Sequence, residues 1–439
     1  MGMTGRRRTR SSSPSVPSRP LKAMLLSAGA LAVCASIAVG CGVVPGVTGG
    51  SGGDSITVMT WAPEETAATN KPGMPAMAQA YARWVNSRGG INGRELRVLT
   101  CNDHDDSVDA AKCARRAAKE DVVAVVGSYS QHGGSFLPPL QGAGIPYIGG
   151  YGLTDDEFKS PLSYPVNGGQ PALLAGLGEE LGRTCGPVSF VRPDTIAGDE
   201  LPVLLNAGLE KGRHAPAVDL RAAEDSTEYA GQADRALARA STDPAKRGCV
   251  VSALGDRTAA FMDSFRHHRE DYPKVRTASV LGSVDQTVID TTGGKSGPYE
   301  SAYVTSWYPA SSDARWNPMK SVIRAQAFKD NRIDPSDAGV QTTWIAYRVL
   351  EQVVEALGDG EVSARTVRRK LDDGMKVTTG RLTPTLSWRF EDLLAAVDFP
   401  RLTNADVTFQ VVRGGQLASA RRGFVNVSKT LESAASNSL

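Results

Sequence analysis

The chain has 439 residues, 41% of them apolar and 22% charged, as is typical of a globular protein long enough for two domains. Its formal net charge is +2, but six basic and no acidic residues lie at positions 1–40, so the remainder carries a net charge of −4. A nucleic-acid-binding protein needs a basic surface on its folded body, and this charge balance argues against nucleic acid as a partner.

Residues 1–40 have the parts of a signal peptide: a basic start, an apolar stretch over Ala23–Val39, and small residues before Cys41. An uncleaved membrane anchor is the alternative, since the apolar stretch is near the shortest that can span a bilayer. The string Ala38-Val39-Gly40-Cys41-Gly42 resembles a bacterial lipobox, whose cysteine becomes lipid-modified. Ala38 stands where leucine is preferred, so cleavage without lipid remains open. We expect an extracytoplasmic protein, anchored to the outer face of the cell membrane through Cys41.

Residues 41–54 are rich in Gly and Ser and predict a flexible linker. The linker ends in Gly-Asp-Ser-Ile at positions 53–56, which matches the nucleophile block of a family of serine esterases. In those enzymes the first strand precedes the serine, whereas here the apolar run follows Ser55. They also need an Asp three residues before a catalytic His near the C-terminus, and the last His of this chain is His268. An esterase using Ser55 is therefore the distant alternative, and we expect no enzyme and no cofactor.

From Ile56 onward, short apolar runs alternate with segments of helical period, which predicts βαβ units and parallel sheets. A first series contains the expected strands Ile56–Trp61, Glu95–Cys101, Val122–Val126 and Ile145–Ile148. A second series follows Pro165, with expected strands at Val188–Val191, Ala217–Leu220, Cys249–Leu254 and Ala278–Leu281. Later material includes a strand-like run at Ala302–Trp307, a helix over Thr342–Leu357 and a strand at Val407–Val412. The fold class is therefore α/β, with two Rossmann-like lobes built on parallel central sheets.

Four cysteines remain after Cys34 in the signal and Cys41 at the proposed lipid site. In an exported chain, four cysteines predict two disulfides, and three pairings are possible. Local geometry favours Cys101 with Cys113 and Cys185 with Cys249. A zinc site is the alternative, but the cysteine spacing does not support it. The polar run Asn102–Asp106 also lacks the spacing of a calcium loop, so we expect no metal.

Several segments, in order, resemble the periplasmic binding proteins of type I that serve as branched-chain amino-acid receptors of ABC importers. These segments are "WVNSRGGINGRELRVL", "CNDHDDSVDAAKCARRAAKEDVVAVVGSYSQHG", "AGIPYIGGYG", "TWIAYRVLEQVVEAL" and "TTGRLTPTLSW". The resemblance implies a hinged two-lobed clamp. The clamp binds a small polar solute, such as an amino acid, and delivers it to a membrane permease. It also implies a monomer. A ligand-sensing receptor lipoprotein of the same fold is the alternative.

In this family the chain crosses between the lobes three times, and we expect the crossings near Pro165, near Gly297 and within 374–380. Lobe I would then hold residues 55–165 and 297–375. Lobe II would hold residues 166–296 and most of 376–435.

The resemblance also indicates where a ligand would lie. Ligands of open parallel sheets bind beyond the carboxyl ends of the strands, and in this family two loops hold the carboxylate and amino groups of the ligand. The matching residues are Ser128, Tyr129, Ser130 and Gln131 in the first loop and Gly150, Tyr151 and Gly152 in the second. Trp61 ends the first expected strand and could line the cleft; packing in the core or at the rim is the alternative. The second loop lacks the family's Ser/Ala/Thr run, and Ala197 stands near the place of a ligand-stacking tyrosine, which puts amino-acid specificity in doubt.

Overall fold

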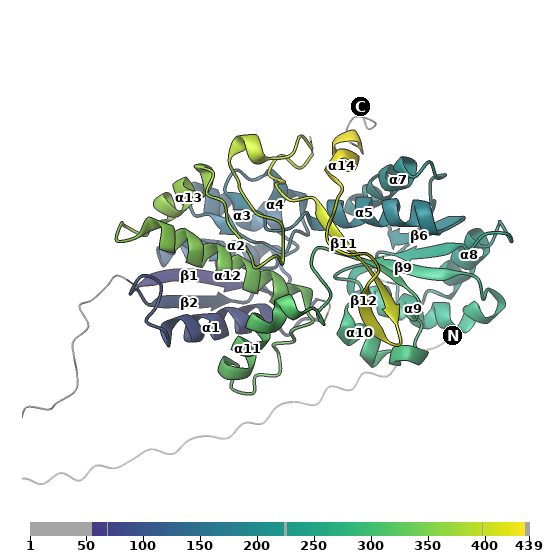
Figure 1. Cartoon of the computed structure of the whole chain (residues 1–439), viewed down its shortest axis with the longest axis horizontal. Helices are drawn as coiled ribbons and strands as arrows, with labels where there is room; N and C mark the ends of the chain where they lie inside the picture. The colour runs from purple at the N-terminus through teal and green to yellow at the C-terminus, as the bar shows by residue number, and fades with distance from the viewer. Residues whose placement is uncertain (1–54, 68, 224–225, 397, 435–439) are drawn as a thin grey trace, which may run out of the picture. The chain divides into compact units, whose positions relative to one another are not determined.

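The computed structural model describes residues 55–67, 69–223, 226–396 and 398–434, and in them it contains two β-sheets, each covered by helices (Figure 1). The residues of the predicted signal peptide and linker, with Cys41, lie outside the described residues. Ser55 is the first described residue, and it is exposed directly before β1. It therefore lies at the amino end of that strand, opposite the carboxyl ends where the expected ligand loops begin.

The first sheet has the strand order β2-β1-β3-β4-β5, and each neighbouring pair is parallel. Its strands are β1 (Ile56–Trp61), β2 (Leu96–Cys101), β3 (Ala124–Val126), β4 (Tyr147–Ile148) and β5 (Ser163–Tyr164). The central position of β1 agrees with its mainly apolar sequence, ITVMTW: Val58 pairs with Val98 on one side and Ala124 on the other and is fully buried.

In the part of the chain that the structure describes, seven helices surround this sheet, and we call the assembly lobe I. They are α1 (Gly73–Asn86), α2 (Ser107–Lys119), α3 (Gly133–Ala143), α4 (Asp155–Lys159), α11 (Asn317–Gln326), α12 (Ala338–Leu357) and α13 (Ala364–Asp372). The helical spacing of Met77, Tyr81 and Val85 places all three on the buried face of α1, which packs against α12. Helix α2 begins after Asp106, whose carboxylate accepts hydrogen bonds from the N–H groups of Val108 and Asp109.

The second sheet has the order β12-β11-β10-β9-β8-β6-β7, and a further short strand pairs with β11. Its strands are β6 (Val188–Pro193), β7 (Val218–Ala222), β8 (Cys249–Ser252), β9 (Arg276–Val280), β10 (Tyr303–Ser306), β11 (Asp406–Arg413), β12 (Gln416–Ser419) and β13 (Val425–Asn426). Strands β6 to β10 are parallel, as predicted. The late strands β11, β12 and β13 run antiparallel, so the sheet is mixed at this edge.

The remaining helices cover the second sheet, and we call this assembly lobe II. They are α5 (Gly169–Thr184), α6 (Ile196–Asp199), α7 (Leu201–Lys211), α8 (Ala230–Ala240), α9 (Thr258–His268), α10 (Gln286–Thr291) and α14 (Ser428–Ala434). Single 3₁₀ turns lie at Gly255–Arg257, Arg269–Asp271, Gly294–Ser296, Ala314–Trp316 and Phe390–Asp392. Within the described residues, no helix combines the length and the apolar character needed to cross a bilayer.

The passages between the sheets differ in part from the predicted crossings. Pro165 lies between β5 of lobe I and α5 of lobe II. The sequence places the second crossing near Gly297, but β10 still pairs with β9, so the chain leaves lobe II only after Ser306. The local turn at Gly297 carries no information on this long-range strand pairing.

The third crossing is predicted within 374–380, but the chain stays beside lobe I for longer. The Trp388 Nε1–H group donates to the Pro165 carbonyl (2.9 Å), and Arg401 Nε–H donates to the Ser163 carbonyl (3.0 Å). The return to lobe II therefore follows Arg401, where Asn404 donates to the Val166 carbonyl and β11 begins.

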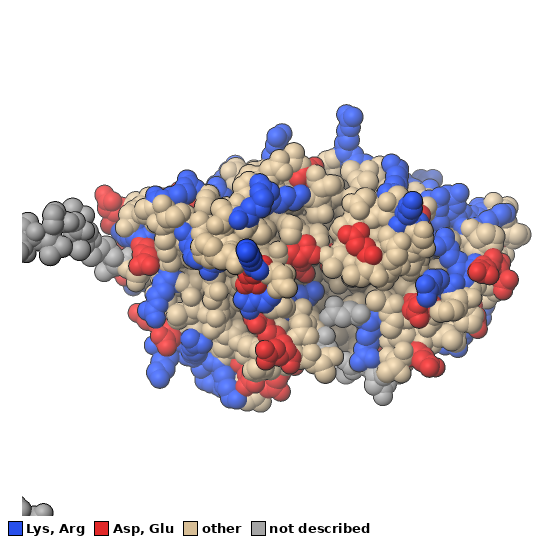
Figure 2. Space-filling model, turned by 90° about the horizontal axis from the view of Figure 1, so that it is seen from below, with Lys and Arg blue, Asp and Glu red and all other residues tan. Residues whose placement is uncertain are grey.

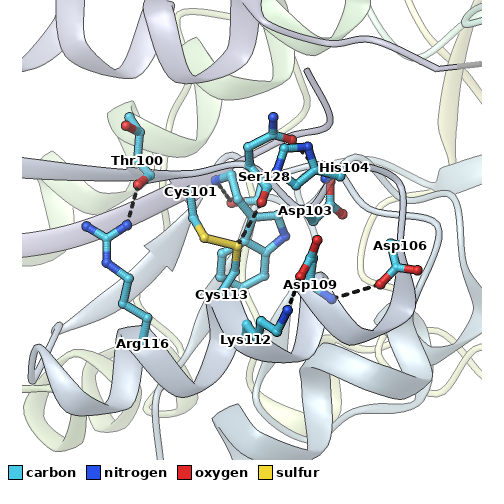
Figure 3. The surroundings of a disulfide bond; sticks show 12 residues. Thr100, Cys101, Asp103, His104, Asp106, Asp109, Lys112, Cys113, Arg116 and Ser128 are labelled. Carbon is cyan, nitrogen blue, oxygen red and sulfur yellow. Dashed lines mark hydrogen bonds and ion pairs between the residues drawn. A yellow bond between two sulfur atoms is a disulfide. The ribbon is translucent and has the colours of Figure 1, made fainter. Parts of the chain in front are cut away.

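The two predicted disulfides are confirmed. Cys101 at the end of β2 is bonded to Cys113 in α2 (Figure 3), and Cys185 after α5 is bonded to Cys249 at the start of β8. The Cα–Cα distance is 5.8 Å in both pairs, within the usual range. The first bridge ties the end of β2 to α2, and the second ties the residue after α5 to the start of β8.

Charged side chains of both signs are interspersed on the face shown in Figure 2. Independently of that view, charged residues of opposite sign form pairs one helical turn apart, such as Lys112 with Asp109 and Arg266 with Asp263. That face therefore presents no continuous basic stripe of the kind that nucleic acid requires.

Candidate functional site

The loop after β3 carries four of the predicted ligand residues. Two of them, Ser128 and Ser130, are buried, and their hydroxyl groups form hydrogen bonds with backbone N–H groups of the chain. Ser128 Oγ accepts a hydrogen bond from the Trp61 N–H group (3.1 Å), and Ser130 Oγ accepts one from the His132 N–H group (3.2 Å). Both serines therefore shape the loop.

Gln131 is the exposed member of this loop. Its Nε2 group donates to Thr69 Oγ1 (3.1 Å), in the loop after β1, and to Asp105 Oδ2 (3.3 Å), in the loop after β2. The strands β2, β1 and β3 are parallel neighbours, so their carboxyl ends meet at one edge of the sheet. Gln131 thus joins the loops that follow all three strands.

The loop after β4 lies directly beside the first one. The Tyr151 N–H group donates to the Ser128 carbonyl (3.0 Å). Gly152 has φ of +83°, which favours glycine, and a Cβ there would lie 2.6 Å from the Asn167 side-chain oxygen. This tight path brings the Tyr151 ring to the edge of lobe I.

Tyr151 connects the two lobes through ring contacts. Its ring centroid lies 5.0 Å from that of Tyr129 and 5.2 Å from that of Trp307, which follows β10 in lobe II. Both pairs are edge-to-face, the arrangement that aromatic rings favour. A Cβ on Gly282, after β9, would lie 2.8 Å from the Tyr151 hydroxyl. Tyr129 and Tyr151 are each 5% exposed, so aromatic side chains fill the space between the loops of the two lobes.

A polar contact also joins the two lobes. Thr287 of α10 donates to the Asp334 carboxylate and lies 3.2 Å from the Ser336 hydroxyl, both in the segment before α12. Asn167 Nδ2, before α5, donates to the Tyr308 hydroxyl (3.1 Å), after β10, so two of the passages between the lobes are also in contact.

Trp61 does not occupy the position predicted for it at the ligand cleft. Its side chain is fully buried and packs against Phe136 (centroids 5.3 Å apart) and Tyr147 (6.1 Å). Side chains alternate between the faces of a strand, and this one points to the face that α2 and α3 cover. Trp61 is a core residue of lobe I.

The polar run 102–106 fills the carboxyl edge of β2 (Figure 3). Asp103 is fully buried, and burial raises the pKa of its carboxyl group, while a hydrogen bond from Ser130 opposes this rise. Among the described residues, no three His, Cys, Asp or Glu side chains are grouped so that they could hold a metal ion. The run thus supplies a helix cap and loop contacts.

Two hollows on the surface lie away from these loops. One, of about 340 Å³, is lined by residues of α8 and α9 that include Asp263 and His267. The other, of about 350 Å³, is lined by residues that include Arg315, Thr379 and Arg381. Neither lining includes a residue of the loops after β3 and β4.

Comparison with known protein families shows the family to which the chain belongs. The model of the periplasmic binding protein family matches residues 65–392, about three quarters of the sequence. The chain belongs to the periplasmic binding protein family. This is a family of solute-binding proteins, and its members lie outside the cytoplasmic membrane. Comparison with curated proteins gives no match.

Solved structures of periplasmic binding proteins share the fold of this chain, at low sequence identity. An ABC-transporter solute-binding protein from Rhodopseudomonas palustris HaA2, in complex with p-hydroxybenzoic acid, aligns with a TM-score of 0.68 at 14% identity, over 85% of this chain and 98% of that one. A leucine-binding protein from Thermotoga maritima aligns with a TM-score of 0.65 at 13% identity, over 84% and 99%. A substrate-binding protein from Ralstonia solanacearum gives 0.66 at 17%, over 83% and 100%. These alignments confirm the two-lobed type I fold of the periplasmic binding proteins.

Two residues of the contact region in this periplasmic binding protein were missed by sequence reasoning. Gly282 and Trp307 follow β9 and β10 at the carboxyl ends of parallel strands. The available signal was a glycine or an aromatic residue directly after an apolar run. This signal did not point to Trp307, because the strand that leads to it was predicted to lie in lobe I.

Proposed function

We propose that this chain is the solute-binding lipoprotein of an ABC importer. It binds a small molecule between the two lobes and delivers it to a permease in the membrane. The observation that carries this proposal is the position of Tyr151: its loop belongs to lobe I, while its ring lies against Trp307 and Gly282 of lobe II. A ligand held there contacts both lobes, which is what hinge closure requires.

The ligand class that fits this place best is a small carboxylic acid with an aromatic ring. The rings of Tyr129, Tyr151 and Trp307 pack edge to face, and a planar ligand can take over these contacts. The first loop leads into the N-terminus of α3, where His132 makes no side-chain cap hydrogen bond. The positive end of a helix dipole stabilises a carboxylate. Two solute-binding proteins of similar fold were solved in complex with 4-hydroxybenzoate, and another protein of similar fold is named as a leucine-binding protein.

Solute screening tests this proposal directly. The chain without residues 1–40 is titrated with benzoate, 4-hydroxybenzoate, leucine and a panel of other amino acids, while Tm and tryptophan fluorescence are followed. We expect 4-hydroxybenzoate or benzoate to raise Tm, because a ligand at 100 times its Kd stabilises the folded state by about 2.7 kcal/mol. The fluorescence should change as well, because Trp307 lies at the site.

Variants of Tyr151 serve as controls for the position of the ligand. Tyr151→Ala should weaken binding on the order of tenfold or more, because it removes a buried ring contact. Tyr151→Phe keeps the ring and should bind within a few-fold of the unchanged chain. Binding of amino acids without binding of benzoates would refute the aromatic class and leave solute binding intact. Indifference to every solute class would refute the whole proposal.

Anchoring through Cys41 forms part of the proposed function and is tested separately. Cys41→Ala should move the protein from the membrane fraction to the soluble fraction, because acyl chains supply the membrane affinity of a lipoprotein. Mass spectrometry of the N-terminal peptide should find lipid on Cys41 in the unchanged chain. A protein that starts at another residue, with no added lipid, would contradict the anchor.

A further inference from the structure

Glu157 is a buried acid beneath the second loop of the candidate site. It lies in α4 and is 2% exposed. Three successive backbone N–H groups point at its carboxylate: Gly152 donates to Oε2 (3.1 Å), while Leu153 (3.0 Å) and Thr154 (3.2 Å) donate to Oε1. The carboxylate therefore supplies the hydrogen-bond acceptor for a stretch of backbone outside any helix or strand.

The backbone of the loop also passes very close to this carboxylate. A Cβ on Gly150 would lie 2.1 Å from Glu157 Oε2 and 2.2 Å from a ring carbon of Tyr147. Only glycine fits between these two side chains. Glu157 thus contacts the loop on both sides of Tyr151, at Gly150 and at Gly152.

Tyr151 itself is held by backbone contacts of its own. Its N–H group donates to the Ser128 carbonyl, and its carbonyl accepts from Asn167 Nδ2 (3.3 Å). The flanking residues are the ones fixed by Glu157. We propose that Glu157 is a positioning residue whose carboxylate holds residues 150–154 in the conformation that presents the Tyr151 ring to lobe II. The value of this position to ligand binding rests on the proposed function, whereas the conformation of the loop does not.

The electrostatics of Glu157 supply a measurable signature. Burial raises the pKa of its carboxyl group from an ordinary 4.5 to about 7, and the backbone N–H donors limit this rise. The Tyr147 phenol of β4 also faces the carboxylate, and its pKa is raised by burial and by the charge of Glu157, with Asp103 of the loop after β2 adding to the rise.

The sign of the pH effect follows from this shift. When the loop opens, water reaches Glu157 and its pKa falls towards 4.5, so the closed loop binds the proton more tightly than the open one. Opening should therefore become easier as pH rises from about 4.5 to about 7, by up to about 300-fold, and should level off at higher pH.

Hydrogen exchange measured by mass spectrometry tests the proposal without any solute. Peptides covering 149–158 are followed between pH 5 and 8, corrected for intrinsic exchange, with α12 as the internal control. Glu157→Gln retains Oε1 as acceptor and cannot ionise, so its protection should stay constant with pH. Glu157→Leu has a similar size and no acceptor, so loop opening at pH 5 should increase at least tenfold over Glu157→Gln.

The two variants make the result decisive. Equal protection of 149–158 in Glu157→Gln and Glu157→Leu would overturn the positioning role. Protection of 149–158 that does not change with pH in the unchanged chain would contradict the raised pKa of Glu157 and the pH effect derived from it. Loss of protection in α12 as well would indicate a general defect of folding and would also count against the proposal. Since no ligand is added, these outcomes are independent of whether solutes bind.

Discussion

Replacing both Cys185 and Cys249 with alanine is expected to lower the free energy of unfolding by about 4 kcal/mol. The disulfide spans 64 residues and joins the end of α5 to the start of β8. A cross-link over so long a loop removes much conformational freedom from the unfolded chain. The variant without the cross-link regains this freedom, which stabilises its unfolded state. Urea unfolding without reductant, followed by circular dichroism, measures the difference.

The second disulfide provides a matched control for this prediction. Cys101 and Cys113 are separated by only 12 residues, so their replacement with alanine should cost about 3 kcal/mol. Cys113 and Cys249 are both buried, so the voids left behind are comparable. A larger loss in the Cys101/Cys113 variant than in the Cys185/Cys249 variant would contradict the explanation by loop length.

The strands of the two sheets could be predicted where a local pattern carried the information. The run Ile56–Trp61 was predicted with the bounds of β1, because a central parallel strand is apolar on both faces. The edge strands β12 and β13 were missed because they are short. The strand β10 was predicted as a run but placed in the wrong lobe, because its partner β9 is chosen by packing across the sheet and by no local signal.

The candidate site could be predicted only as a pair of loops. A sequence pattern shows which loops follow parallel strands, and the structure places the loops with Tyr129 and Tyr151 side by side. The pattern cannot show which side chains of a loop form hydrogen bonds with its backbone and are therefore not available to a ligand. Ser128 and Ser130 serve the backbone, while Glu157, which lies outside the predicted loop, supplies the acceptors for it. The contact of Ser128 with Trp61 is distant in sequence, whereas Ser130 and Glu157 act within five residues of themselves. What the pattern does not show for them is burial.

The contacts between the lobes bear on how a solute would enter. The Tyr151 ring of lobe I lies against Trp307 and Gly282 of lobe II. A solute that binds there must therefore take the place of ring contacts, and the lobes must separate to admit it. The Thr287 contact with Asp334 and Ser336 closes the same interface. The energy lost in opening these contacts is subtracted from the affinity for the solute.

Replacing Trp61 with alanine is expected to lower the free energy of unfolding by about 3–5 kcal/mol, because the indole is fully buried and leaves a cavity. Its Nε1 atom has no hydrogen-bond partner among the described residues, so the loss comes from packing against Phe136 and Tyr147. Urea unfolding measures it.

Phe390→Ala is the control for Trp61→Ala, since the Phe390 side chain is 85% exposed and its removal should change the stability by no more than about 0.5 kcal/mol. Trp61→Phe fills part of the cavity and loses no hydrogen bond, so its cost should lie between those of the other two variants. An aromatic residue at the end of a parallel strand can face either the ligand or the helices that cover the sheet. The sequence alone does not distinguish these two orientations, whereas the structure does so for Trp61. A Trp61→Ala variant that kept its stability but lost solute binding would restore Trp61 to the site, whereas a large loss of stability confirms that it belongs to the core that supports the loop at Ser128.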